Sequence, residues 1–132
     1  MDFVCKKDKN GRAFYDVNAS DFELINNSIL NKGTAFSAAE REQFKLYGLL
    51  PPEITTIEQQ RARAYQSFKN KNSDIEKYIS LRTLQDSNET LFYNLLYHHI
   101  TEILPFVYTP VVGLACQHFS HIYRRPRGIF IG

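Results

Sequence analysis

The clearest chemical potential in the sequence lies in the stretch Val107-Tyr108-Thr109-Pro110. Thr109 is a typical helix N-cap, and Pro110 suits the first helical position because a proline lacks only an N–H that is not needed there. Tyr108 would then lie near the positive end of a helix, where a developing phenolate is stabilised. A phenol keeps its proton at neutral pH and can act as a general acid. Spacing alone favours a core or boundary aromatic, because the chain has eight tyrosines.

Histidines and a cysteine near the C-terminus raise the question of a metal site. His118 and His121 share a helix face, but Cys116 points elsewhere, and no carboxylate or third histidine follows one turn later. His98 and His99 are adjacent, so they cannot both face one ion. Packing or surface roles are favoured for all four histidines, and no metal ligand is predicted in this chain.

Three arginines, Arg124, Arg125 and Arg127, form a basic cluster that could bind phosphate. Cations are also favoured in the last turn of a helix by the helix dipole, and this second interpretation is preferred. The whole chain has 16 Lys and Arg against 14 Asp and Glu, which gives a net charge of +2. Without these three arginines the net charge would be negative, so the positive charge is local to this cluster. The chain therefore lacks the extended positive potential expected of a nucleic-acid-binding protein. The six glycines form no phosphate-binding loop, so no cofactor is expected on this chain.

Repeated cap signals predict an all-α domain of about five to six helices. Hydrophobic residues make up 43% of the 132 residues, enough for a packed core. The predicted helices are a short one at 21–29 after Ser20, one from Ser37 to Gly48, one from Thr56 to about Asn70, one from Ser73, one opened by Asp86 that ends before Pro105, and one from Thr109 that Pro126 stops.

The two ends of the chain differ from this helical pattern. Residues 1–19 show neither helical nor strand periodicity and are interpreted as an arm, so the helical domain covers 20–127. Residues 128–132 are a short apolar run, which predicts the first strand of a following domain that is absent, with the sequence cut rather than finished. Cys5 and Cys116 suggest no disulfide or zinc site, and neither a secretion signal nor 18 consecutive apolar residues is found. A cytoplasmic protein with no membrane partner is expected.

Residues 30–132 resemble the N-terminal helical domain of malic enzymes, most closely those of the NAD-linked bacterial branch. Five phrases in matching order carry the resemblance. They are Leu30-Asn31-Lys32-Gly33-Thr34-Ala35-Phe36, Gly48-Leu49-Leu50-Pro51-Pro52, Asn88-Glu89-Thr90-Leu91-Phe92-Tyr93, Tyr108-Thr109-Pro110-Val111-Val112-Gly113-Leu114-Ala115-Cys116, and Tyr123-Arg124-Arg125-Pro126-Arg127-Gly128-Ile129-Phe130-Ile131.

The resemblance implies oxidative decarboxylation of L-malate to pyruvate and CO₂, with NAD(P) and Mg²⁺ or Mn²⁺ bound by the remainder of the enzyme. Tyr108 matches the family's general acid, which protonates enolpyruvate, and Thr109 and Pro110 would line the substrate site. The catalytic lysine, the metal ligands and the cofactor domain would lie outside this chain, which alone should be inactive. The family also implies a homo-oligomer, either a dimer or a tetramer.

Some family members have a fumarate site, and only part of it matches. Arg63 matches one of its two arginines, whereas Ser87 replaces the second arginine and Thr55 the glutamate. Fumarate activation is therefore not expected, because one cation cannot pair with both ends of a dicarboxylate. Two alternatives to the malic enzyme assignment stay open. One is a malolactic enzyme, which converts malate to lactate and CO₂, and the other is a non-catalytic helical interaction or dimerisation module.

Overall fold

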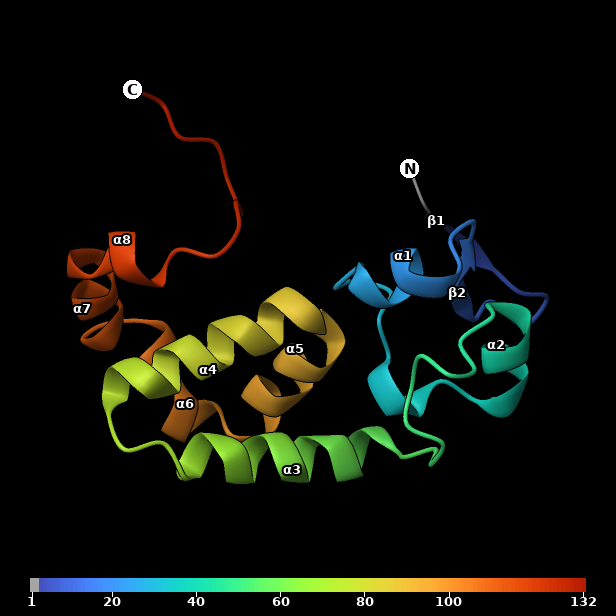
Figure 1. Ribbon diagram of the computed structural model, residues 1–132, viewed down its shortest axis with the longest axis horizontal. Helices are drawn as coiled ribbons and strands as arrows, with labels where there is room; N and C mark the ends of the chain where they lie inside the picture. The colour runs from blue at the N-terminus through green and yellow to red at the C-terminus, as the bar shows by residue number, and fades with distance from the viewer. Residues whose placement is uncertain (1–2) are drawn as a thin grey trace.

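Helices dominate the computed structural model, which describes residues 3–132 (Figure 1). They are α1 (Asp21–Asn26), α2 (Ala38–Gln43), α3 (Ile57–Lys69), α4 (Asp74–Ser87), α5 (Glu89–His98), α6 (Ile100–Val107), α7 (Val111–Gln117) and α8 (Phe119–Ile122), with a 3₁₀ turn at Gly33–Ala35. The expected mostly helical class is confirmed. The helices are shorter and more numerous than the sequence pattern indicated.

Capping boxes explain where three of these helices begin. Both halves of the box are present at Ser37 with Glu40, at Thr56 with Gln59, and at Ser73 with Glu76. In each, the hydroxyl accepts a hydrogen bond from the backbone N–H three residues later, and the longer side chain accepts one from the N-cap N–H. These three predicted starts are confirmed. Ser20 precedes α1 without a side-chain cap hydrogen bond, so the cap signal at Ser20 does not form a capping box.

The predicted end of the second helix and the predicted start of the helix at Asp86 are both wrong. The second helix, α2, ends at Gln43 rather than at Gly48, because Lys45 already has a left-handed backbone with φ of 56°. The N-cap of α5 is Asn88 rather than Asp86, and its Oδ1 accepts a hydrogen bond from Leu91 N at 3.0 Å. Asp86 instead lies inside α4, which continues to Ser87.

The single helix expected from Asp86 to the residue before Pro105 is divided between two helices. His99 separates α5 from α6, and Pro105 lies inside α6 instead of ending the helix before it. A second break at His118 separates α7 from α8. By length and composition alone, Ile100–Gln117 would be apolar enough to cross a membrane. This stretch is interrupted between α6 and α7 in the structure, so it does not form one continuous helix.

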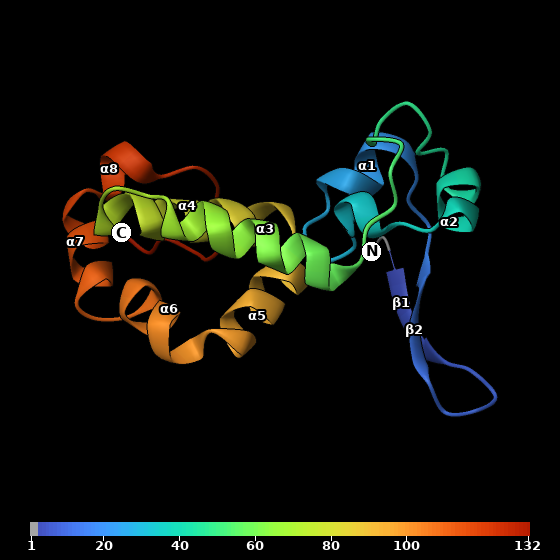
Figure 2. The same ribbon diagram turned by 90° about the horizontal axis from the view of Figure 1, so that it is seen from below.

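A β-hairpin occupies the N-terminal arm, where no strand was expected. Strand β1 (Phe3–Lys7) pairs antiparallel with β2 (Ala13–Val17), with Phe3 opposite Val17. The Asp8 carboxylate accepts hydrogen bonds from two backbone N–H groups of the loop, and Gly11 has a φ of 79°, which glycine adopts without strain. The hairpin projects away from the helices (Figure 2).

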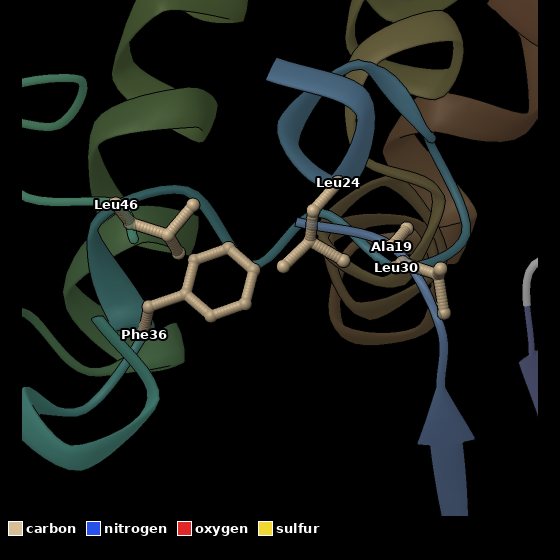
Figure 3. Close-up of a cluster of buried hydrophobic side chains, with 5 residues drawn as sticks. All are labelled: Ala19, Leu24, Leu30, Phe36 and Leu46. Carbon is tan, nitrogen blue, oxygen red and sulfur yellow. The ribbon is translucent and has the colours of Figure 1, made fainter. Parts of the chain in front are cut away.

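Most of the buried hydrophobic side chains form two separate clusters. One lies in the N-terminal unit, residues 3–55, and consists of Ala19, Leu24, Leu30, Phe36 and Leu46 (Figure 3). The other lies in the helical bundle formed by α3–α8 and consists of Phe68, Leu81, Phe92, Leu95 and Ile103. Burial of such side chains contributes about 1.5–3 kcal/mol each. The domain limits predicted above stay predictions.

A buried arginine organises the N-terminal unit. Arg41 on α2 is 2% exposed, and its guanidinium donates to five backbone carbonyl oxygens at 2.7–3.3 Å. These oxygens belong to Thr34, Phe36, Pro51, Pro52 and Glu53. The planar, five-donor guanidinium suits this task, because it can donate to several carbonyl oxygens at once. Arg41 thus ties two irregular segments to a short helix.

Backbone and amide contacts join the N-terminal unit to the bundle. Asn31 Nδ2 donates to Ser87 O at 2.8 Å, and Glu89 N donates to Ser28 O at 2.8 Å. Gly33 has a φ of 55°, and a Cβ there would come within 3.0 Å of Gln60 Oε1. Glycine is therefore needed at this close approach between the 3₁₀ turn and α3.

Two arginines in the segment after α8, Arg125 and Arg127, bind the C-terminal end of α4. Arg127 donates to Gln85 O at 2.7 Å and Asp86 Oδ1 at 2.6 Å, and Arg125 donates to Asp86 O at 2.9 Å. Both arginines thus lie at the C-terminal end of a helix, where the helix dipole favours cations, but this helix is α4 rather than the helix that precedes them in the chain. Residues 128–132 are irregular and pair with no strand among residues 3–132, so the strand expected there stays a prediction.

Candidate active-site segment

Tyr108 lies at the junction of α6 and α7. It is the C-cap of α6, with its backbone N–H donating to Leu104 O at 3.0 Å, and its carbonyl accepts a hydrogen bond from Val112 N at 2.9 Å. Two consecutive helices therefore fix its backbone. The residue is 65% exposed, so its phenol is accessible to groups outside the bundle.

Thr109 and Pro110 are exposed beside Tyr108, but they do not begin α7 in the predicted way. The helix starts at Val111, Pro110 is the residue before it, and the structure shows no side-chain cap hydrogen bond there. Instead, backbone carbonyls accept the hydrogen bonds of the first turn of α7. Tyr108 O accepts from Val112 N, and Pro110 O accepts from Gly113 N at 3.1 Å. The predicted Thr109 cap is therefore wrong. Tyr108 still adjoins the N-terminal end of a helix, although α7 has only seven residues.

A polar cluster between α3 and α6 anchors the helix that carries Tyr108. Glu102 on α6 accepts hydrogen bonds from Tyr65 Oη at 2.5 Å and from Lys69 Nζ at 2.9 Å. The Tyr65 ring also stacks on His99, with ring centroids 3.8 Å apart. Ile103, the residue after Glu102 on α6, is fully buried in the bundle core. Together these contacts fix α6 against α3, one and a half turns before the phenol.

The charges in this cluster shift one another's pKa values. The hydrogen bond from Tyr65, and then that from Lys69, lower the pKa of Glu102 below its usual value of 4.5. The same carboxylate raises the pKa of Tyr65 and that of Lys69. Each shift favours the protonation state that keeps the cluster bonded.

These shifts predict a pH-dependent stability. A carboxyl group whose pKa is lowered on folding stabilises the fold above its unfolded pKa, and this contribution is lost as pH falls through the folded pKa, below 4.5. Glu102→Gln should therefore lower the free energy of unfolding at pH 7 and make less difference at pH 3. Urea denaturation at both pH values measures this. The exposed Glu53→Gln is the control, and equal effects of Glu102→Gln at the two pH values would contradict the assignment.

The histidines and cysteines do not converge. The rings of His118 and His121 lie 6.5 Å apart at an interplanar angle of 50°, and Cys116 is exposed with a free thiol. Within residues 3–132 no group of three His, Cys, Asp or Glu side chains is arranged to hold a metal ion. Any ion used by a larger enzyme would need ligands from other residues.

Residues at the matched fumarate positions lie on α3 and α4 and in the segment before α3. Arg63 Nη2 donates to Thr55 Oγ1 at 3.4 Å, a long contact, and the hydroxyls of Thr55 and Thr34 are 2.5 Å apart. Ser87 Oγ donates to the carbonyl of Leu84 within its own helix. Arg63 and Thr55 are thus in contact, so a neutral hydroxyl rather than a carboxylate lies beside Arg63.

Sequence reasoning missed the anchoring group around Glu102. Tyr65 and Lys69 lie 37 and 33 residues from Glu102, so neither helical nor strand periodicity relates them to it. Only knowledge of how α3 packs against α6 would have identified these partners. Spacing alone favoured a core or boundary role for Tyr108, and its exposure of 65% places it at the boundary rather than in the core.

Comparison with known proteins places this segment within a family. Residues 85–132 match the model described as malic enzyme, N-terminal domain, which includes α5–α8 and Tyr108. NAD-dependent malic enzymes of Aliivibrio fischeri and Aeromonas salmonicida are 55% and 56% identical over 82% of this chain. NAD-dependent malic enzyme 2 of Photobacterium profundum is 53% identical over 83% of it. The chain spans about a fifth of the length of these relatives. Residues 85–132 of this mostly helical chain thus match the N-terminal domain of malic enzymes, and 82% of the chain is similar in sequence to NAD-dependent malic enzymes.

Proposed function

We propose that this chain contributes the proton donor of an enzyme that oxidatively decarboxylates L-malate to pyruvate and CO₂ with reduction of NAD. The observation that carries the proposal is the exposed phenol of Tyr108 on an anchored helix junction, within sequence about 55% identical to proteins named NAD-dependent malic enzymes. Loss of CO₂ from the oxidised acid leaves enolpyruvate, which must gain a proton at carbon. Tyr108 supplies it: its O–H bond breaks as the new C–H bond forms.

NAD and a divalent ion would be held by other residues of the enzyme. The sequence contains no glycine-rich dinucleotide loop, and the described residues offer no metal ligand set. When bound, NAD accepts the hydride and the ion polarises the carbonyl. The role of this chain is limited to proton donation by Tyr108 and to substrate-site lining by the exposed Thr109 and Pro110.

An assay of the product of the complete open reading frame that encodes this sequence tests the proposal. With L-malate, NAD⁺ and Mn²⁺, we expect equal amounts of NADH and pyruvate. Lactate with no net NADH would instead identify a malolactic enzyme, and no turnover would favour an interaction module. The 132-residue chain alone, assayed in parallel, should give no NADH.

We also propose that the enzyme is a cytoplasmic homo-oligomer that binds neither nucleic acid nor membrane. The exposed, unpaired Cys5 and Cys116 fit a reducing compartment. Exposed apolar side chains on α5 and α6, among them Tyr97 at 79% and Leu104 at 47%, fit contacts with the remainder of the enzyme or a second subunit. Sedimentation equilibrium of the complete product should give a dimer or a tetramer.

Fumarate should not activate this enzyme through the matched positions. A dicarboxylate bound there would meet one guanidinium, that of Arg63, beside the neutral Thr55 and with Ser87 in place of a second cation. We expect the KM for malate and kcat to be unchanged by fumarate, and Arg63→Gln to leave this result unchanged. An increase in activity that Arg63→Gln abolishes would contradict the prediction.

A further inference from the structure

A cavity of about 200 Å³ lies between α4, α8 and the chain that follows α8. It does not include Tyr108. Its walls include Tyr78 and Arg82 from α4, Phe119 from α8, and Tyr123, Arg124 and Phe130 from the C-terminal segment. In Figure 1 the C-terminal chain leaves α8, runs beside the bundle and then turns away from the helices. Basic and aromatic groups thus share one small cavity.

The charges around the cavity are strongly unequal. Four arginines line it, at positions 82, 124, 125 and 127, against a single carboxylate, that of Asp86. Arg127 is neutralised by ion pairs with Asp86 at 2.6 Å and Glu89 at 2.8 Å. The other three guanidinium groups form no ion pair with any carboxylate in residues 3–132. The cavity therefore carries about three positive charges that lack counter-charges.

The hydrogen bonds of these arginines leave donors available. Arg82 donates to the neutral Oε1 of Gln85 at 2.6 Å, and Arg125 donates to the backbone oxygen of Asp86 at 2.9 Å. Arg124 makes no hydrogen bond within the described part of the chain. A guanidinium has five N–H donors and binds phosphate oxygens in a bidentate manner. Phosphate is thus an anion whose oxygens these groups fit.

One wall of the cavity is aromatic. The rings of Phe119, Tyr123 and Phe130 contact one another, with centroids 5.5–6.3 Å apart. Phe130 remains 70% exposed and Tyr123 48% exposed, so both rings keep accessible surface. Planar rings stack on such surfaces. A ligand that carries a phosphate and a planar ring would use both walls at once.

We propose that this cavity is a binding site for an organic phosphate of mononucleotide size. The phosphate is held by Arg82 and Arg124, and the ring lies against Phe130 and Tyr123. The cavity of about 200 Å³ is smaller than the roughly 300–1,000 Å³ typical of pockets that enclose drug-sized ligands, so it would hold the phosphate while the ring lies on the exposed faces of Phe130 and Tyr123. The hydrogen bonds of Arg125 and Arg127 to α4 hold the segment that forms one wall.

Isothermal titration calorimetry of the 132-residue chain tests this site, with AMP, inorganic phosphate and adenosine as separate probes. We expect saturable binding of AMP with a stoichiometry of one and affinities about tenfold lower for phosphate or adenosine alone. Arg124→Gln should weaken AMP binding about tenfold, since one charged hydrogen-bonding group is lost. Phe130→Ala should weaken AMP binding without changing that of inorganic phosphate.

The exposed Arg12 in the hairpin loop offers a matched control, and Arg12→Gln should leave AMP binding unchanged. Circular dichroism of each variant verifies that the helices are retained. The proposal is overturned if AMP shows no saturable binding, if the Arg82→Gln, Arg124→Gln double variant binds AMP as tightly as the unmodified chain, or if inorganic phosphate binds as well as AMP. Because the readout is binding, the result is independent of malate turnover.

Discussion

Replacing Tyr108 by phenylalanine should lower malate decarboxylation by about two orders of magnitude or more in the product of the complete open reading frame. The change removes only the hydroxyl group, so the exposed junction between α6 and α7 should keep its backbone hydrogen bonds to Leu104 and Val112. The loss should appear mainly in kcat, because a proton donor acts in the transition state rather than in substrate binding. Steady-state kinetics with malate and NAD⁺ measures it.

Tyr97→Phe is the matched control for this substitution. Tyr97 is also a strongly exposed tyrosine, 79% accessible on the neighbouring helix α5, and no catalytic role is assigned to it. Its loss should leave kcat unchanged. If Tyr108→Phe retained full turnover, Tyr108 would not be the proton donor, whereas the sequence similarity to malic enzymes would be unaffected.

Replacing Arg41 by methionine should lower the free energy of unfolding by about 3 kcal/mol or more. Methionine fills a similar volume but donates no hydrogen bond, so five backbone oxygens would lose their donor. Those oxygens lie in Thr34, in Phe36 and in residues 51–53, so both irregular segments of the N-terminal unit should loosen. Chemical denaturation of the 132-residue chain, followed by circular dichroism, gives the difference.

Two further variants make the Arg41 experiment specific. Arg41→Lys keeps the charge but has a single nitrogen with three donors, so it should recover only part of the stability. Arg63→Met removes an exposed arginine that makes one hydrogen bond of 3.4 Å, and it should change the stability by no more than about 0.5 kcal/mol. Equal effects of Arg41→Met and Arg63→Met would show that the carbonyl contacts contribute little.

Local signals in the sequence predicted those parts of the fold that depend on neighbouring residues. The box at Thr56 and Gln59 formed as predicted, because both of its hydrogen bonds join residues three positions apart. The α5 cap was misplaced because Asp86 and Glu89 have the same spacing, while Asn88 makes the actual bond. The hairpin also had a local signal, Asn10-Gly11, which is typical of a tight turn between strands.

Features that depend on distant residues could not be predicted from spacing. The Glu102 cluster joins α3 to α6, and the five acceptors of Arg41 come from both sides of α2. The sequence pattern gives no signal of the break at His99, because apolar residues continue on both sides of it. Tyr108 itself was identified by resemblance rather than by geometry, because the pattern alone favoured a packing role.

The distance between Tyr108 Oη and a bound malate analogue tests the central claim most directly. It can be measured in a crystal structure of the complete gene product with NAD⁺, a divalent ion and a non-reactive dicarboxylate such as tartronate. We expect the phenol oxygen within hydrogen-bonding reach of the analogue, at about 2.6–3.2 Å. A phenol directed into the helical bundle, out of reach of the bound dicarboxylate even through one water molecule, would contradict the account.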